Sequence, residues 1–305
     1  MSQRENWKVY FMLIVTMIFW GLSFIWYKQA LPIFTPVTII FLRMIISAPL
    51  LFCFAYFIGR LKKIQRKDIK MFLSLAFFEP FLYFMAESNG LKYVSSSLAS
   101  IIIATIPLFT LFTAYYFFNE RLTYNNYTGI FLSFIGAVVV IYADGIFGQV
   151  SATGIVLMFI AVLSTLGYTA ILKKLSSEYG ALTIVGYQNL IGSIYTLPFF
   201  LMQDFNGLTS QNLTLKNLLP VIYLSVFAST IAFILFVRGI KKIGIAKSMV
   251  FTNFIPVVTA VLAVYMLNEG MGILKAAGIF LTVMGLMISQ SGNFSRIRIY
   301  SRIKR

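Results

Sequence analysis

Long apolar segments separated by short polar connections make up most of the chain. An apolar helix of about 20 residues is long enough to cross roughly 30 Å of hydrocarbon. We expect ten such spans, at residues 8–28, 36–58, 70–91, 96–118, 126–143, 153–172, 181–201, 218–237, 247–267 and 271–290. The pattern predicts an all-α membrane protein with ten transmembrane helices.

The composition supports this prediction and removes several function classes. Hydrophobic residues make up 59% of the chain and charged residues 11%, and the mean hydropathy is +0.87. A soluble domain is roughly half apolar and a quarter charged, so a water-soluble core cannot account for these values. Histidine is absent and Cys53 is the one cysteine. Zinc and haem sites therefore lack their ligands, and we expect no metal and no cofactor.

The formal net charge of +16 indicates an orientation. With the N-terminus in the cytoplasm, 20 of the 25 Lys and Arg residues fall on the cytoplasmic side of the expected spans. Because excess positive charge stays in the cytoplasm, we expect a multi-pass inner (plasma) membrane protein with both termini cytoplasmic. The basic residues lie between apolar spans, which argues against nucleic-acid binding. A contact of the basic tail with anionic lipid is an alternative use of the charge.

An internal repeat relates the two halves of the chain. Residues 90–142 align without a gap with residues 239–291 when the sequence is shifted by 149, with 14 identities in 53 positions. Pro107 aligns with Pro256, and the Asn-Glu pair at 119–120 aligns with the pair at 268–269. Hydrophobicity alone does not align prolines and carboxylates, so we interpret the match as a duplication.

The duplication predicts two inverted five-helix repeats. Because five spans are an odd number, the second copy enters the membrane from the opposite face. We expect the first repeat at residues 1–148, the second at 149–291 and a basic cytoplasmic tail at 292–305. Inverted repeats are typical of secondary transporters, whose binding site lies near the midplane between the halves. Two similar halves can exchange conformations and so give inward-open and outward-open states of comparable energy.

Several motifs resemble those of a known family. They are Trp-Gly-Leu-Ser-Phe at 20–24, Phe-Leu-Arg at 41–43, the run from Gly90 to Ser100, Pro-Leu-Phe-Thr at 107–110 and Asn-Glu-Arg-Leu at 119–122. The chain resembles the EamA family of the drug/metabolite transporter superfamily over nearly its whole length. It departs from the pattern at Gly270, where the first copy has Arg121, and at residues 166–168.

The resemblance implies a ten-helix permease with a central cavity lined by both halves. Substrates of this family include amino acids, nucleoside-like metabolites and other small solutes, and they are most often exported. We therefore expect efflux of a small organic metabolite, such as an amino acid or amine. A non-transporting membrane sensor or assembly partner, or a flippase for a lipid-linked metabolite, is the alternative.

The third expected span carries the clearest candidate residues. Glu79 lies near its middle and is followed by Pro80, which kinks a helix and frees a backbone carbonyl. An ionisable side chain inside a span usually faces a cavity and marks a pathway. Glu79 is either a carboxylate for a substrate ammonium or a coupling proton, or a structural partner of Arg43. Glu87, with Tyr83 between the two carboxylates, is either a ligand or a solvated residue near the outer end.

Other candidates lie at a similar depth in neighbouring spans. Arg43 can hold a carboxylate of the substrate or of the protein. Gln188 and Asn189 can bind substrate or join helices by hydrogen bonds. Trp20 and Tyr187, like Tyr83, can enclose an apolar substrate or simply pack, and an amine adds cation–π attraction.

Prolines and Asn-Glu pairs suggest how the halves move and where helices begin. We expect Pro80, Pro107 and Pro256 to act as hinges. The pairs at 119–120 and 268–269 are expected to cap the fifth and tenth helices, because a carboxylate is stabilised at a helix N-terminus.

The sequence contains no sign of an enzyme. It has no histidine, no G-x-S-x-G motif and no phosphate-binding G-x-x-x-x-G-K motif, so we expect no catalytic residues.

The expected partners are a small-molecule substrate, the lipid bilayer and protons as coupling ion. Transport would use a gradient or exchange, by a monomer or homodimer.

Overall fold

The computed structural model describes residues 3–109, 123–147, 151–205, 213–244 and 248–303. The expected Asn119-Glu120 cap lies outside these residues. The described part is helical and contains no strand. In chain order its helices are α1 (Gln3–Ala30), α2 (Pro36–Phe57), η1 (Arg66–Asp68), α3 (Ile69–Ala76), η2 (Phe77–Leu82), α4 (Tyr83–Gly90), α5 (Ser96–Ile103), α7 (Tyr124–Phe147), α8 (Ala152–Glu178), α9 (Ala181–Gln203), α10 (Leu215–Tyr223), η4 (Leu224–Ala232), α11 (Phe233–Ile243), η5 (Val250–Asn253), α13 (Phe254–Leu267) and α14 (Ile273–Ile303).

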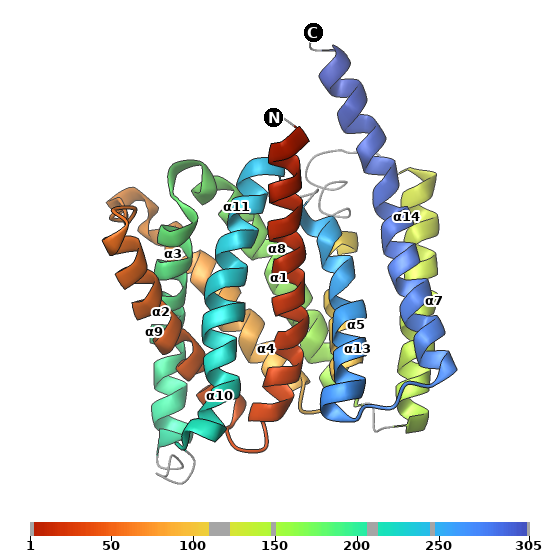
Figure 1. The fold of residues 1–305 in the computed structure, drawn as a ribbon, viewed down its shortest axis with the longest axis horizontal. Helices are drawn as coiled ribbons and strands as arrows, with labels where there is room; N and C mark the ends of the chain where they lie inside the picture. Colours follow the sequence, from red (N-terminus) through yellow and green to blue (C-terminus); the bar gives the residue numbers. More distant parts are fainter. Residues whose placement is uncertain (1–2, 110–122, 148–150, 206–212, 245–247, 304–305) are drawn as a thin grey trace.

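The helices form one bundle, and the two ends of the described chain lie at the same end of it (Figure 1). Six helical segments are long and apolar enough to cross a membrane. They are Trp7–Ala30, Pro36–Phe57, Arg66–Gly90, Tyr124–Ala143, Ala152–Glu178 and Leu215–Ile243. Three shorter apolar helices occupy Ser96–Phe109, Phe251–Leu267 and Ile273–Ser289, and α9 has 23 residues. The chain is therefore an all-helical, multi-pass membrane protein in its described part.

Local sequence explains where several helices begin. Thr35 caps α2, its hydroxyl accepting the Thr38 N–H at 3.2 Å, and Pro36 occupies the first turn, where no N–H is needed. Ser95 caps α5 in the same way by accepting the Leu98 N–H at 3.0 Å.

The third membrane segment is interrupted at the predicted proline. Glu79 has φ −147° and ψ 118°, an extended conformation, inside the π-helical segment η2. Pro80 lacks an N–H and disfavours the α conformation for the residue before it. The carbonyl of Phe78 is satisfied from another helix, because the Ser164 hydroxyl of α8 donates to it.

The membrane segment Leu215–Ile243 contains a second π-helical interruption, η4, which no feature of the sequence predicted. Segment η4 joins α10 to α11 and has no proline. Hydroxyl groups of η4 instead donate to backbone carbonyls within and just before it: Thr230 donates to the Ser225 carbonyl at 2.8 Å, and Ser225 donates to the Val221 carbonyl of α10 at 2.7 Å.

Helices α7 and α14 pack against each other at one edge of the bundle (Figure 1). Glycines allow their backbones to touch. A Cβ atom on Gly136 would lie 2.7 Å from the Gly278 carbonyl, and one on Gly129 would lie 2.5 Å from the Gly285 carbonyl. Each of these contacts therefore requires the absence of a side chain.

Glu269 corrects one expectation about helix caps. From the sequence, Glu269 is expected at the start of the tenth helix. In the structure its carboxylate instead accepts the Ser96 N–H and the Ser97 hydroxyl of α5, both at 2.8 Å, and lies 3.3 Å from Lys275 Nζ. Asn268 ends α13 in the left-handed conformation, with φ 54°, and so turns the chain toward α5. Glu269 thus joins three helices.

These contacts predict a pH-dependent contribution to stability. Burial raises the pKa of Glu269, but Lys275 and the Ser96 and Ser97 donors outweigh burial, so the pKa is lower than usual. The stabilisation is therefore present above the ordinary Glu pKa, near 4.3, and is lost as the pH falls through the lower folded value. We expect Glu269→Gln to lower the unfolding temperature by several degrees at pH 7, and by less at pH 4. Thermal unfolding in detergent measures both differences, and an equal loss at the two pH values would contradict the ionic contribution.

Candidate functional site

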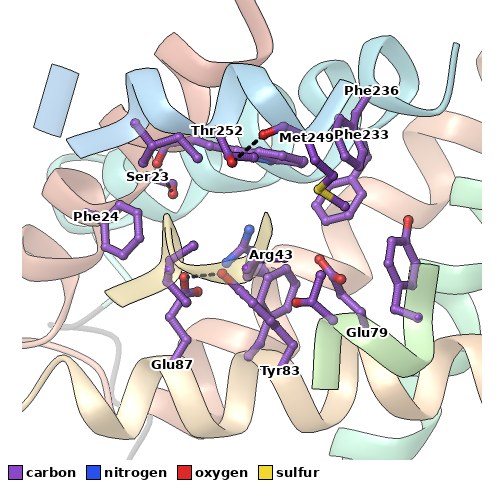
Figure 2. Close-up of a pocket in the computed structure, with 17 residues that line it drawn as sticks. Ser23, Phe24, Arg43, Glu79, Tyr83, Glu87, Phe233, Phe236, Met249 and Thr252 are labelled. Carbon is purple, nitrogen blue, oxygen red and sulfur yellow. Dashed lines mark hydrogen bonds between the residues drawn. The ribbon is translucent and has the colours of Figure 1, made fainter. Parts of the chain in front are cut away.

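A cavity lies in the middle of the bundle, between elements from both halves of the chain. The space inside it and at its open mouth that no protein atom fills is about 600 Å³. Its walls come from α1, α2, η2, α4, α5, α8, α11, η5 and α13. Figure 2 shows Glu79, Tyr83 and Glu87 on one side of the space, and Phe233, Met249 and Thr252 on the other.

Aromatic rings form much of the wall. Trp20 of α1 has its ring centroid 5.4 Å from that of Phe233 and 4.8 Å from that of Phe236, both on α11. Phe233 also contacts Phe84 of α4 and Tyr168 of α8, with centroid separations of 6.4 and 6.5 Å. Rings from both halves thus enclose a predominantly apolar space with π faces available to a cation.

Arg43 of α2 is buried at the edge of this cavity. Its Nε donates to the Ser229 hydroxyl of η4 at 2.8 Å. The guanidinium carbon lies 3.8 Å from the ring centroid of Phe84 and 5.8 Å from that of Tyr27. Within the described residues Arg43 forms no ion pair with a carboxylate. Stacking on Phe84 and the bond to Ser229 instead hold its side chain in place.

Glu79 brings a carboxylate into the apolar space at the helix interruption. The residue is 6% exposed, and its Oε2 has no hydrogen-bond partner among the described residues. A buried carboxylate oxygen without a donor is costly, because the protein replaces none of the hydrogen bonds that water would make. The site is therefore chemically suited to a ligand that donates hydrogen bonds or carries positive charge.

Glu87 has a different environment from Glu79. It lies one turn after Tyr83 on α4, and the Tyr83 hydroxyl donates to its Oε1 at 2.9 Å (Figure 2). The side chain is also buried, at 5% exposure. Glu87 is thus partly satisfied by the protein, whereas Glu79 retains an unmatched oxygen.

Five of the eight predicted binding residues line the cavity: Trp20, Arg43, Glu79, Tyr83 and Glu87. The three predicted on α9 are not among its lining residues.

The residues on α9 lie behind the cavity wall. Gln188 accepts a hydrogen bond from Tyr168 at 3.4 Å, and Tyr168 does line the cavity. Asn189 Nδ2 donates to the Ser47 hydroxyl at 2.8 Å and to the Ser229 carbonyl at 3.3 Å. Tyr187 packs edge-on against Phe52 and Phe72 of neighbouring helices. In this structure Gln188 therefore bonds to a side chain of the cavity wall, and Asn189 bonds to the backbone of Ser229, whose hydroxyl accepts from Arg43.

The three predicted hinge prolines are all buried, in η2, after α5 and in α13. Each one directly follows a residue of the cavity wall, because Pro80 follows Glu79, Pro107 follows Ile106 and Pro256 follows Ile255. A helix distortion at any of these prolines would therefore move a wall residue.

Several wall residues were not among the predicted site residues. They are Ser23, Phe24, Phe84, Ile103, Ile106, Thr165, Tyr168, Phe233, Phe236, Met249, Thr252 and Ile255. Most are apolar, and an apolar residue that faces a cavity looks the same in sequence as one that faces lipid. In the described part of the chain, no three His, Cys, Asp or Glu side chains lie where they could together hold a metal ion.

Comparison with known proteins identifies the family. The model of the EamA-like transporter family matches the chain twice, over residues 7–142 and 152–290. The chain belongs to the EamA-like transporter family. Its motifs at residues 20–24 and 107–110 thus lie within an EamA-like sequence, as their resemblance suggested.

Relatives of this EamA-like protein match nearly its whole length. An uncharacterized transporter of Archaeoglobus fulgidus is 28% identical over 281 residues, covering 92% of this chain and 98% of that protein. The uncharacterized transporter YcxC of Bacillus subtilis is 27% identical over 299 residues, covering 94% of each. A crystal structure with 17% identity has a TM-score of 0.66 and covers 90% of this chain and 97% of its own, which shows the shared fold. The family match and the apolar helices together identify the chain as a multi-pass membrane transporter.

Proposed function

We propose that this EamA-like protein is a secondary transporter that exports a small amine-bearing metabolite, such as an amino acid or amine, by alternating access. The observation that carries the proposal is the unmatched carboxylate oxygen of Glu79 in an aromatic cavity between the two halves. An ammonium group supplies both the hydrogen bonds and the positive charge that this oxygen lacks. The surrounding rings would then bind the apolar part of the substrate.

The charges of the cavity favour exchange with protons. Among the described residues that line it, Arg43 supplies a permanent positive charge, and Glu79 and Glu87 supply two carboxyl groups. When both carboxyl groups are ionised, one negative charge is left unbalanced in an apolar space. A proton or an amine cation can each neutralise it, and the two would compete for the same carboxylate. Competition of this kind couples the outward movement of one to the inward movement of the other.

Pairings between helices support the proposed ten-helix architecture of two inverted repeats. Helix α2 packs on α9 and α7 packs on α14, and each pair joins equivalent helices of the two repeats. The π-helical segment η2, shifted by 149 residues, falls inside η4. The family model also matches once in each proposed repeat. Six long apolar segments, three shorter apolar helices and α9 would supply the ten spans.

We further propose that both termini face the cytoplasm across the inner membrane. The ends of the described chain and the basic connection at residues 60–70 lie at one end of the bundle (Figure 1). Positively charged connections remain on the cytoplasmic side during insertion.

The proposed direction of transport is export, because export prevails in the family that the chain resembles.

Transport by purified protein in liposomes tests the proposal. We expect uptake of at least one member of a panel of primary amines and amino acids when the interior is acidic, with proton efflux followed by a trapped pH dye. Matched carboxylic acids and alcohols without the amine should not be transported. Amine uptake that neither depends on a pH gradient nor moves protons would contradict coupling. Absence of transport across the whole panel would contradict the amine substrate, and absence of transport across a broad panel of other metabolites as well would favour the sensor.

A further inference from the structure

A strongly basic surface lies on the connection between α2 and α3, far in sequence from most cavity residues. We call residues 60–70 the basic loop. Six of its eleven residues are basic, and each of the six is exposed: Arg60, Lys62, Lys63, Arg66, Lys67 and Lys70. The loop therefore presents a high density of positive charge to its surroundings.

Acidic side chains balance little of this charge. Asp68, the acidic residue of the loop, is 6% exposed and accepts a hydrogen bond from the Tyr179 hydroxyl at 2.6 Å. In the described part of the chain, Glu178 forms an ion pair with the loop, at 3.3 Å from Lys67 Nζ. Both partners of that pair are substantially exposed, so it contributes little to stability. Lys62 Nζ donates to the Glu178 carbonyl oxygen at 3.4 Å. The exposed side chains of Arg60, Lys63, Arg66 and Lys70 can interact with solvent or a ligand.

The backbone of the basic loop is held against the turn between α8 and α9. The Lys62 N–H donates to Thr183 Oγ1 at 3.2 Å, and the Gln65 N–H donates to the Tyr179 hydroxyl at 3.1 Å. The Thr183 hydroxyl in turn donates to the Arg60 carbonyl at 3.4 Å. Leu61 and Ile64, between the basic residues, pack against the core. The basic side chains thus extend outward from an ordered backbone.

Large apolar side chains flank the loop. Tyr56 and Phe57 at the end of α2 are 75% and 84% exposed, and Ile69 at the start of α3 is also exposed. Exposed rings next to basic residues are typical of the level at which hydrocarbon meets lipid headgroups. A loop with this pattern would hold its six basic side chains at the level of the lipid phosphates.

Orientation during insertion does not explain the ordered structure of this loop. Positive charge directs topology while a segment is still being inserted, and it needs no particular fold to do so. A ligand site does need fixed positions, because ordering flexible side chains on binding lowers affinity.

We infer that the basic loop binds the phosphate groups of anionic phospholipids in the leaflet that faces it. Arg66 can hold a phosphate through two N–H groups, and the lysines add charge around it. The inference depends on membrane location alone and holds whether or not the protein moves an amine.

The test is a titration of the full-length protein with short-chain phosphatidylglycerol in a neutral detergent, followed by thermal unfolding. We expect phosphatidylglycerol to raise the unfolding temperature more than phosphatidylcholine does. The gain should shrink at about 1 M salt, where screening acts within about 3 Å. A variant with Lys62, Lys63, Arg66 and Lys70 replaced by Gln should bind roughly fivefold more weakly for each basic residue removed.

A matched variant controls for net charge. Replacing Lys173, Lys174, Lys241 and Lys242 by Gln also removes four exposed positive charges, and this variant should keep the wild-type response. Both variants should unfold at the wild-type temperature without lipid. Equal losses in the two variants, or an unchanged response in the loop variant, would overturn the inference. Inorganic phosphate that reproduces the gain would overturn the assignment to a lipid.

Discussion

Glu79→Gln is expected to lower amine transport by about 10- to 100-fold while leaving the protein folded. The substitution keeps the size of the side chain and removes its negative charge. A hydrogen bond to a charged group contributes about 1.5–3 kcal/mol, which corresponds to this loss of rate or affinity. Folding should be unaffected or improved, because the change removes a buried carboxylate whose Oε2 has no partner in the described structure. Transport in liposomes and thermal unfolding in detergent measure the two effects separately.

Two further substitutions make this result specific. Glu79→Asp retains the charge and should retain part of the activity, since the carboxylate is only shortened. Glu178→Gln removes an exposed carboxylate, outside the cavity, that pairs with Lys67, and it should transport normally. Full transport by Glu79→Gln would disprove the role of this carboxylate in substrate binding or coupling.

Gly136→Leu is expected to separate α7 from α14 and to reduce the yield of folded protein severely. A Cβ atom at this position would lie 2.4 Å from the Thr282 backbone nitrogen and 2.7 Å from the Gly278 carbonyl oxygen. Overpacking in a filled interior costs about 1–3 kcal/mol, and backbone atoms cannot move aside as a flexible side chain can. The fraction of monodisperse protein after extraction and its unfolding temperature should both fall.

Gly145→Leu is the matched control for this prediction. It makes the same change on the same helix, but a Cβ atom on Gly145 would meet no atom within 4 Å. Leucine is a better helix former than glycine, so this variant should be as stable as the wild type. If both variants behaved alike, helix propensity or lipid exposure would account for the effect, and close packing would not.

Helix positions follow from local sequence and were largely predictable. The second span was expected at residues 36–58 and α2 occupies Pro36–Phe57, while the seventh was expected at 181–201 and α9 occupies Ala181–Gln203. Apolar length, the Thr35 cap and prolines are local signals. Segment η4 was missed because the hydroxyls that satisfy its backbone resemble ordinary polar residues in a helix.

The cavity was predictable only in part. Glu79, Tyr83 and Glu87 lie on one expected span, so the sequence alone placed them close to one another. Depth in the membrane can be counted at about 1.5 Å per residue, but the rotation of one helix against another cannot. Gln188 and Asn189 therefore had the expected depth, yet they contact Tyr168 and Ser47 behind the wall.

Local sequence patterns could not predict contacts between residues far apart in the chain. Glu269 binds Ser96 across 173 positions of sequence, and no motif near Glu269 distinguishes this partner from the start of α14. The aromatic wall of the cavity could not be predicted for the same reason. Phe84, Phe233 and Phe236 meet only after folding, and each alone resembles a lipid-facing residue.

The glycine contacts between α7 and α14 also affect how the chain is made. Helix α7 ends at Phe147 and α14 begins at Ile273, so a ribosome adding about 5–20 residues per second needs on the order of ten seconds between them. During that interval the glycine face of α7 cannot pack against α14, because α14 has not yet been made. The close packing of α7 therefore cannot form until the last helix is made, and a truncated chain would leave the glycine face of α7 without its partner.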